Sequence, residues 1–139
     1  MNLLALVTRL DKLKAYHTST TKLYPGEAAG VTATANGAGG FAKGTYAQIS
    51  SGLVFATRYK PTAIIVTNAS AVDEYEIDLA TGAAASEVLG GTFKVTGNGR
   101  YPITFAEVAE QTRIAVRIGC LDGVARTLEI GIEFIDGLT

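Results

Sequence analysis

The sequence predicts an all-β fold: an antiparallel, jelly-roll-like β-sandwich with one N-terminal amphipathic α-helix. Three observations lead to this prediction. Short apolar runs with a two-residue period recur along most of the chain, and Gly, Asn and Asp turns separate them. No helical pattern lies between these runs, which excludes a doubly wound α/β fold. Apolar positions at three- and four-residue spacing occur in one place, residues 2–16.

The composition limits the classes of protein to consider. The 139 residues suit one domain. Apolar residues make up 47% and charged residues 18%, below the typical share of about 25%. Such a chain has either a large core or a surface that partners cover. The formal net charge of −1 argues against nucleic-acid binding, and no apolar run approaches the roughly 20 residues of a membrane helix.

The N-terminal segment is typical of an amphipathic helix. One stripe of it collects the apolar residues Leu3, Leu6, Val7, Leu10 and Leu13. A helix this short is marginal alone in water, so the stripe must be buried. The leucines fit a and d positions of two heptads, which favours an oligomer or docking interface. The alternative is a helix packed on its own domain. The segment lacks a basic n-region, so we expect it to be retained and not cleaved as a signal peptide.

Three parts follow from these patterns. Residues 1–17 form the helix for oligomerisation or docking, residues 18–26 a Ser/Thr-rich linker, and residues 27–139 the β-sandwich domain. Within that domain we expect strands over residues 45–50, 62–68, 74–80, 91–97, 100–105, 112–119 and 126–135. The run at 62–68 is continuously apolar and bounded by Pro61, which is typical of a strand buried on both faces.

Alternation assigns a direction to the side chains of three strands. Inward positions are Tyr75, Ile77, Leu79, Ile114, Val116, Ile118, Leu128, Ile130, Ile132 and Phe134, and outward positions are Glu74, Glu76, Asp78, Arg113, Arg117, Glu129 and Glu133. Between the last two strands, Asp122-Gly123 predicts a hairpin turn. In that hairpin the outward arginines of one strand would face the outward glutamates of the other.

The stretch NGAGGFAKGT at residues 36–45 contains the residue types of a phosphate-binding loop. That motif requires a lysine directly after its last glycine and a helix after it. Here Lys43 precedes Gly44, and a strand pattern follows. We therefore expect a glycine-rich turn, with positive φ at its glycines, after which Phe41 returns to the core and Lys43 points to water.

No constellation of residues predicts catalysis, a cofactor or a metal. His17 is the single histidine, and no serine lies in a nucleophile-elbow motif. Cys120 is the single cysteine and ends an apolar strand, so we expect a buried thiol. The outward carboxylates are typical of a solvated face. The sequence thus favours a protein that is not an enzyme.

One long segment resembles a family of small virion proteins of tailed bacteriophages. The segment STTKLYPGEAAGVTATANGAGGFAKGTYAQI carries the family's Ser/Thr-rich start, its K-x-Y-P, its A-A-G-V-T run and its glycine-alanine turn. The segments AIIVTNASAVDEYEIDLATG and SEVLGGTFKVTG extend the resemblance over about residues 18–135. Phe41 stands where relatives tend to have tryptophan, and the leucine helix is not part of the shared pattern.

Members of this family are capsid decoration (cement) proteins or related head-surface proteins. The resemblance implies a β-sandwich that binds the major capsid protein of its phage on the outside of the shell, commonly as a homotrimer. It implies a protein made in the bacterial cytoplasm and located in the virion. Other virion parts, such as a head-fibre base or tail protein, and a carbohydrate-binding or adhesion module are the alternatives.

Overall fold

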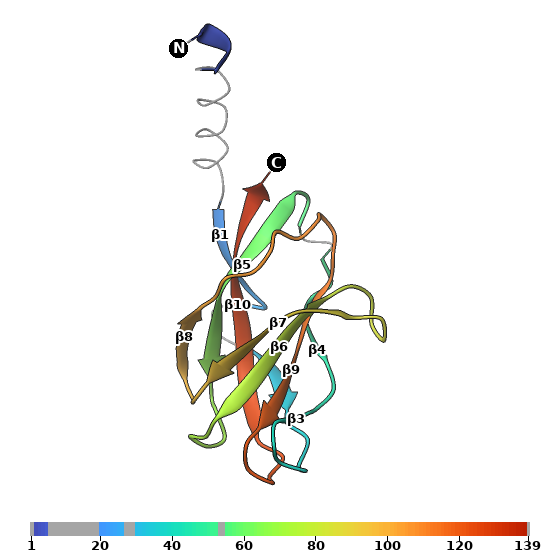
Figure 1. Cartoon of the computed structure of the whole chain (residues 1–139), viewed down its shortest axis with the longest axis vertical. Helices are drawn as coiled ribbons and strands as arrows, with labels where there is room; N and C mark the ends of the chain where they lie inside the picture. The colour runs from blue at the N-terminus through green and yellow to red at the C-terminus, as the bar shows by residue number, and fades with distance from the viewer. Residues whose placement is uncertain (1, 6–19, 27–29, 53–54, 139) are drawn as a thin grey trace.

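The computed structural model of the protein describes residues 2–5, 20–26, 30–52 and 55–138, and shows two antiparallel sheets packed face to face (Figure 1). The predicted all-β sandwich is confirmed. The strands assigned among these residues are β1 (Thr20–Tyr24), β2 (Val31–Thr34), β3 (Ala42–Lys43), β4 (Ala47–Ser50), β5 (Arg58–Thr67), β6 (Tyr75–Thr81), β7 (Val88–Val95), β8 (Gly99–Pro102), β9 (Ile114–Cys120) and β10 (Thr127–Leu138).

Each sheet has one strand that pairs with three others, β10 in sheet A and β9 in sheet B. In sheet A the order is β1-β10-β5-β8, and β2 pairs with the first part of β10 on the same side as β1. In sheet B the order is β3-β9-β6-β7, and β4 also pairs with β9. Among the assigned strands, β6 and β7 are the consecutive pair that forms a hairpin. β7 is therefore hydrogen-bonded to its sheet along one edge, through β6.

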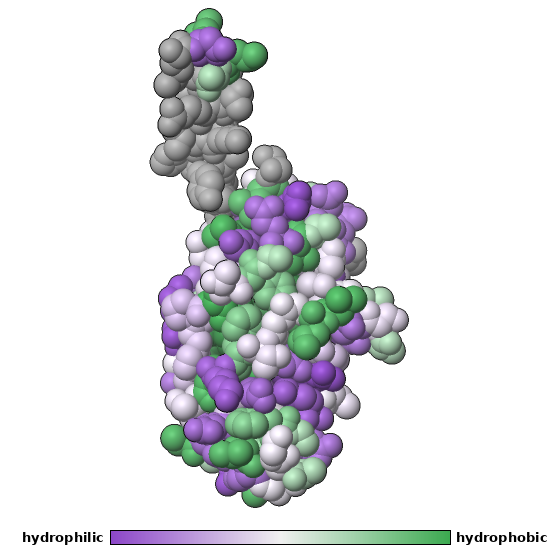
Figure 2. Space-filling view, viewed as in Figure 1, coloured by the Kyte–Doolittle hydropathy of each residue, from purple (hydrophilic) through white to green (hydrophobic). Residues whose placement is uncertain are grey.

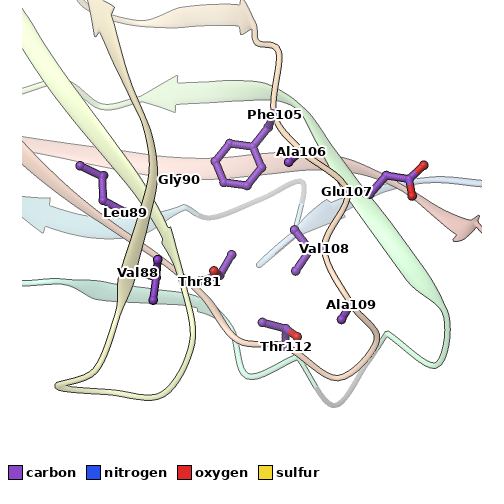
Figure 3. A pocket seen from close by; sticks show the side chains of 10 residues that line it. All are labelled: Thr81, Val88, Leu89, Gly90, Phe105, Ala106, Glu107, Val108, Ala109 and Thr112. Carbon is purple, nitrogen blue, oxygen red and sulfur yellow. The ribbon is translucent and has the colours of Figure 1, made fainter.

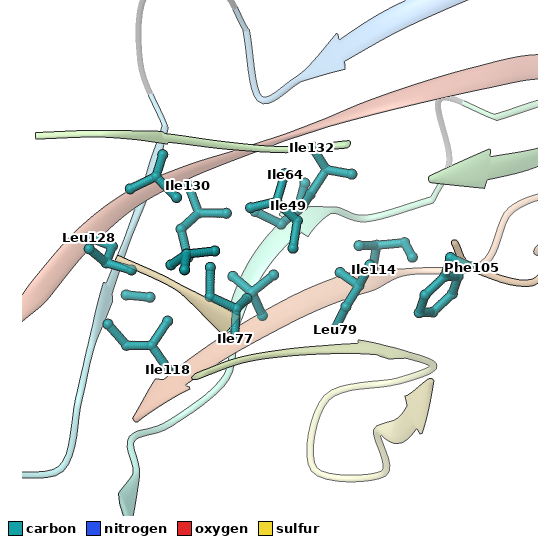
Figure 4. Packing of buried hydrophobic residues seen from close by; sticks show 14 of the residues in the cluster. Ile49, Ile64, Ile77, Leu79, Phe105, Ile114, Ile118, Leu128, Ile130 and Ile132 are labelled. Carbon is teal, nitrogen blue, oxygen red and sulfur yellow. The ribbon is translucent and has the colours of Figure 1, made fainter. Parts of the chain in front are cut away.

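The core lies between the sheets and follows the predicted alternation. Every side chain predicted to point inward from β6, β9 and β10 is fully buried. Figure 4 shows Ile77 and Ile118 of sheet B facing Leu128 and Ile130 of sheet A. Burial of one such side chain contributes about 1.5–3 kcal/mol. The inward side chains of β6, β9 and β10 thus form a large part of the core.

Aromatic rings close the core near the end of β1, where Tyr24 lies 5.1 Å from the Phe55 ring. Phe55 stacks on Tyr59 with ring centroids 3.9 Å apart, and Phe134 meets both rings edge-on. The hydroxyl of buried Tyr59 donates to the carbonyl of Thr112, and burial raises the pKa of this tyrosine. The ring cluster ties β5 and β10 to the segment that precedes β9.

The predicted hairpin at Asp122-Gly123 is wrong. β9 belongs to sheet B and β10 to sheet A, so residues 121–126 cross from one sheet to the other. Two strands that pair and two strands that face each other across a sandwich have the same inward and outward alternation. The pattern therefore gave the side-chain directions correctly and the strand pairing incorrectly.

Part of the predicted linker at residues 18–26 is a strand. β1 pairs with β10 from Thr20↔Asp136 to Tyr24↔Ile132. β2 covers the same side of β10 only from Thr127 to Ile130, so β1 covers the remainder of that edge. The threonines of this Ser/Thr-rich segment are β-branched residues that favour a strand.

The strand predicted at residues 62–68 begins earlier and is not buried on both faces. β5 starts at Arg58 and includes Pro61, beside a register shift between Glu133 and Phe134 of β10. Proline is tolerated within a strand at such an irregularity. Ile64 and Val66 are buried, whereas Ile65 between them is partly exposed.

The N-terminal helix is described only at its beginning. Residues 3–5 have a helical backbone, and Asn2 Oδ1 accepts a hydrogen bond from Ala5 N over 2.8 Å, which is an N-cap. Leu3 of the predicted interface is exposed. The other predicted interface residues, Leu6, Val7, Leu10 and Leu13, lie outside the described residues.

Candidate interaction surfaces

A buried charge lies on the outward face of sheet B, where solvated carboxylates were predicted. Asp78 is only 2% exposed. Its carboxylate accepts hydrogen bonds from Arg117 Nε at 2.8 Å and Thr92 Oγ1 at 2.7 Å, and Lys43 Nζ lies 3.7 Å away. Asp78 is buried because long side chains from neighbouring strands cover it. A carboxylate with this many partners is held for structure and offers no free acid or base.

Arg117 of β9 and Arg113, which directly precedes β9, bind partners within sheet B. The Arg117 guanidinium packs over the Tyr46 ring, 4.6 Å from the centroid. Arg113 donates to Gln48 Oε1 at 2.9 Å and to Glu87 Oε1 at 3.1 Å. The predicted pairing of these arginines with the glutamates of β10 is therefore wrong.

The outward glutamates of β10 pair within sheet A instead. Glu129 accepts a hydrogen bond from Asn68 Nδ2, and Glu133 accepts two from Arg100. The bonds from Arg100 are the largest cause that lowers the pKa of Glu133. The outward arginines and glutamates therefore bind partners within their own sheets.

The glycine-rich stretch is a turn, as predicted, but two of its side chains differ from expectation. Positive φ occurs at Gly39, Gly40 and Phe41. Phe41 does not return to the core: its ring lies on the outward face of sheet B, 5.3 Å from Lys94 Nζ. Lys43 lies 3.7 Å from the carboxylates of Glu76 and Asp78 and does not point freely to water. The chain bends outward at Phe41, and this bend places Lys43 over the outward face of sheet B.

Cys120 is buried as predicted, and two carboxylates adjoin it. The ligand atoms of Asp73, Cys120 and Asp122 lie within 4.8 Å of one another. Burial, followed by hydrogen bonds to the two aspartates, raises the pKa of the thiol to about 12. The protonated thiol donates to Asp73 Oδ2 at 3.0 Å or to Asp122 Oδ1 at 3.1 Å, and Arg126 binds Asp122. These groups satisfy one another and fasten the loop after β9.

Three loops meet at the end of the sandwich that lies away from the start of β1 and the end of β10 (Figure 1). They span residues 36–41, 68–74 and 121–126. Backbone bonds link them: Leu121 N donates to Glu74 O, Gly40 N to Leu121 O, and Ser70 N to Thr127 O, all within 3.0 Å. The loops therefore form one continuous surface.

Apolar side chains are exposed on these linked loops. Val72 is 89% exposed, and Leu121 and Val124 are about half exposed. We call Val72, Leu121 and Val124 the loop-end surface. Figure 2 shows apolar side chains at this lower end of the face in view and beside the β6–β7 connection. Apolar side chains held in the open by bonded loops are typical of a protein contact.

A second apolar surface lies along the first part of β7. Val88 is 66% exposed and Leu89 50% exposed. Beside them is a groove of about 310 Å³, lined by Thr81, Val88, Leu89, Gly90, Phe105, Ala106, Glu107, Val108, Ala109 and Thr112 (Figure 3). Figure 3 shows the Phe105 ring against the strand at Gly90. We call Val88, Leu89, Gly90 and this groove the β7 surface.

Known proteins give no further assignment. No protein-family model, curated protein or solved structure matches the chain. No helix among the described residues is long and apolar enough to cross a membrane. The resemblance in the sequence and the surfaces of the fold are therefore the grounds for a function.

Sequence reasoning missed both surfaces. It selected the leucine stripe because a helical period makes an amphipathic face visible. The loop-end surface has no period, and its signal was the presence of Val72, Leu121 and Val124 in turn segments where polar residues prevail. Much of the β7 surface lies between the strands predicted at residues 74–80 and 91–97, because β7 begins at Val88, three residues before the predicted start.

Proposed function

We propose that the chain is a structural virion protein that binds the outer surface of a tailed-bacteriophage capsid and stabilises the shell as a decoration (cement) protein. The observation that carries the proposal is the loop-end surface. The resemblance of residues 18–135 to small phage virion proteins supports the choice of partner, the major capsid protein.

The loop-end surface suits docking on a large, fixed partner. Its apolar side chains stand on loops whose backbones already bond to one another, as Leu121 N does to Glu74 O. Cys120, Asp122 and Arg126 brace the same loops. A contact that is ordered before it binds loses less conformational entropy on association. Val72 is the most exposed of the three apolar side chains and would make the first contact with the capsid protein.

The long axis of the sandwich separates this surface from the start of β1. β10 has twelve residues and runs from the loop end to the end where β1 begins. Twelve extended residues span about 40 Å. In the proposal, the loop-end surface contacts the shell while the Leu3–Leu13 stripe joins three copies at the far end. A protein that binds the assembled shell and not its loose subunits stabilises the shell by mass action.

The test is binding to capsids of the phage that encodes the chain. Purified protein is mixed with these capsids, and electron microscopy locates the added density. We expect density on the outer shell, and loss of binding in the Val72→Asp and Leu121→Asp variants. Ala84→Asp is the control, because it places the same charge on an exposed apolar residue that belongs to neither apolar surface.

Three results would overturn the proposal. Density confined to a fibre or the tail would assign the chain to another virion component. Equal binding by wild-type protein and both loop-end variants would exclude this surface as the contact. A glycan that bound the protein in the absence of any capsid binding would favour the adhesion module instead.

A further inference from the structure

The β7 edge is the longest exposed strand edge in the described part of the chain. β7 has eight residues and pairs with β6 on one side. The opposite edge of β7 pairs with no strand among the described residues. None of the backbone hydrogen bonds of the described turns and loops involves residues 88–95. An edge of this length leaves a row of backbone donors and acceptors available for another strand.

The other edges are short or blocked. β8 has four residues and ends in Pro102, which has no N–H to donate. β2 and β4 have four residues each, and β3 has two. β1 has five and carries Lys22. Folded proteins keep edges short, charged or interrupted in this way to prevent pairing. β7 carries Lys94 and an irregularity at Gly90, but it is the longest of these edges.

From this contrast we propose that β7 pairs with β7 of a second copy, antiparallel and about a two-fold axis, so that sheet B continues from one subunit into the next. The register that the residues favour sets Gly90 opposite Gly91 of the second copy. It then sets Leu89 opposite Thr92, Val88 opposite Phe93, and Glu87 opposite Lys94. The two-fold axis makes each of these contacts twice.

This register keeps every pair on one face of the sheet. The pairing of β7 with β6 places Leu89 beside Ala80 and Thr92 beside Asp78, both on the outward face. Val88 and Phe93 lie beside Thr81 and Ile77 on the inward face. The register shift at Leu79/Ala80 leaves Gly90 as the extra residue, and it is this residue that keeps the two halves of β7 in phase.

The charges and the apolar side chains also match in this register. Lys94 lies over the Phe41 ring and makes no ion pair among the described residues. Glu87 of the second copy, which Arg113 of its own subunit binds at 3.1 Å, would bring a carboxylate opposite this lysine. Val88, which is exposed, would cover the partly buried Phe93 ring of the second copy next to the groove. A register displaced by two residues would set Lys94 opposite apolar Leu89. Complementary charges and apolar contacts therefore select the Gly90–Gly91 centre.

The inference is independent of the capsid proposal, because it concerns two copies of this chain and uses a different surface. A contact between two strand edges is small, and we expect it to be weak in isolation. A two-fold contact at β7 would join oligomers that the N-terminal leucines form. The combination of a three-fold and a two-fold contact builds closed assemblies or nets in which each weak contact is reinforced.

Cysteine cross-linking tests the register directly. The full-length variants Leu89→Cys and Thr92→Cys are mixed under mild oxidation, since both positions are exposed and face each other only between copies. We expect a disulfide-linked dimer in the mixture and little in either variant alone, because each position would lie well away from its own copy. The wild-type chain, whose single Cys120 is buried, is the control.

A second measurement follows the assembly itself. Sedimentation of Val88→Lys/Leu89→Lys should stop at the mass of the oligomer that the N-terminal leucines form, whereas the wild type should reach a larger mass at high concentration; the circular dichroism spectrum should be unchanged. When Leu6→Asp/Leu10→Asp is added to the Leu89→Cys and Thr92→Cys chains, the disulfide between the two variants should still form. Absence of the mixed cross-link, equal cross-linking of Leu89→Cys alone, or an unchanged mass in the lysine variant would overturn the proposal.

Discussion

Arg117 donates a hydrogen bond from Nε to Asp78 Oδ2 over 2.8 Å, on the outward face of a sheet where Asp78 is nearly inaccessible to water. The same length joins Arg100 Nη2 to Glu133 Oε1 on the other sheet, where the arginine side chain is 53% exposed. The two ion pairs therefore share their shortest distance and differ in burial, and the exposed pair has a second hydrogen bond from Arg100 Nε at 3.2 Å. They can be compared as a buried and an exposed pair.

Arg117→Met should destabilise the protein by about 2–3 kcal/mol, because it leaves the Asp78 carboxylate buried with Thr92 and Lys43 as its remaining partners. Arg100→Met should cost only about 0–1 kcal/mol, as is usual for an exposed pair. Urea unfolding at neutral pH gives both values. Equal losses in the two variants would contradict the assignment of Asp78 as a buried charge.

Alkaline pH should destabilise the native state in part through Cys120. Burial raises the pKa of this thiol from 9.0 to about 12. A raised native pKa means that the native state holds the proton more strongly than the unfolded state. The contribution to stability is thus complete below pH about 9 and is lost as the pH rises from about 9 toward 12.

The measurement for the thiol is a comparison of pH profiles. Between pH about 8 and about 10, wild-type protein should lose about 1 kcal/mol more free energy of unfolding than Cys120→Ala. Other groups that titrate in this range act on both proteins and cancel in the difference. Parallel profiles would show that the thiol does not contribute.

Gly90→Ala should destabilise the protein by about 1–3 kcal/mol, the usual cost of overpacking. A Cβ at position 90 would come within 2.2 Å of Phe105 Cζ, and the Phe105 ring belongs to the core. Gly26→Ala is the control, because a Cβ there meets nothing within 4 Å.

A double-mutant cycle shows whether the ring is the cause. Phe105→Leu shortens the side chain that Gly90→Ala would strike, so the two changes together should cost less than the sum of the single changes. Strict additivity in thermal or urea unfolding would place the effect of Gly90→Ala in the backbone of β7 and not in the Phe105 contact.

Leu6→Asp/Leu10→Asp should reduce a trimer to smaller species and leave the β-sandwich folded. The two charges would interrupt the stripe that predicts association at residues 2–16. Light scattering reports the mass, and circular dichroism with thermal unfolding reports the fold. Arg9→Glu, off the stripe, is the control.

Two outcomes would contradict the prediction for the leucines. A wild-type monomer at micromolar concentration would exclude the trimer. Unfolding of the whole domain in the double variant would show that the helix belongs to the core of its own subunit, which is the alternative that the sequence left open.

The direction of side chains could be predicted from the sequence, and the pairing of strands could not. Ile114 and Ile130 are both inward because alternation depends on the pleat of each strand alone. Whether β9 lies beside β10 or across from it depends on contacts between residues far apart in the chain. Asp122-Gly123 has the residues of a hairpin turn, and here those residues lie in a connection between two sheets.

The burial of polar groups is the second feature that could not be predicted from the sequence. Asp78 alternates with apolar neighbours in the same way as an exposed residue, and its cover comes from Arg117, Thr92 and Lys43 on three other strands. Likewise, exposed Val72 and Val88 are unremarkable apolar residues until the loops and the edge that carry them are known. The leucine stripe is the candidate surface that a sequence period could reveal.

The arrangement of β1 has a mechanical consequence. The chain enters β1 at Thr20, beside Asp136, and the loop-end surface lies at the opposite end of β10. Tension between the loops and the N-terminal segment therefore acts along the axis of β1. Because the hydrogen bonds of an antiparallel ladder run across the strands, this tension is shared by all five residue pairs at once. The ladder is loaded in shear and does not open one rung at a time.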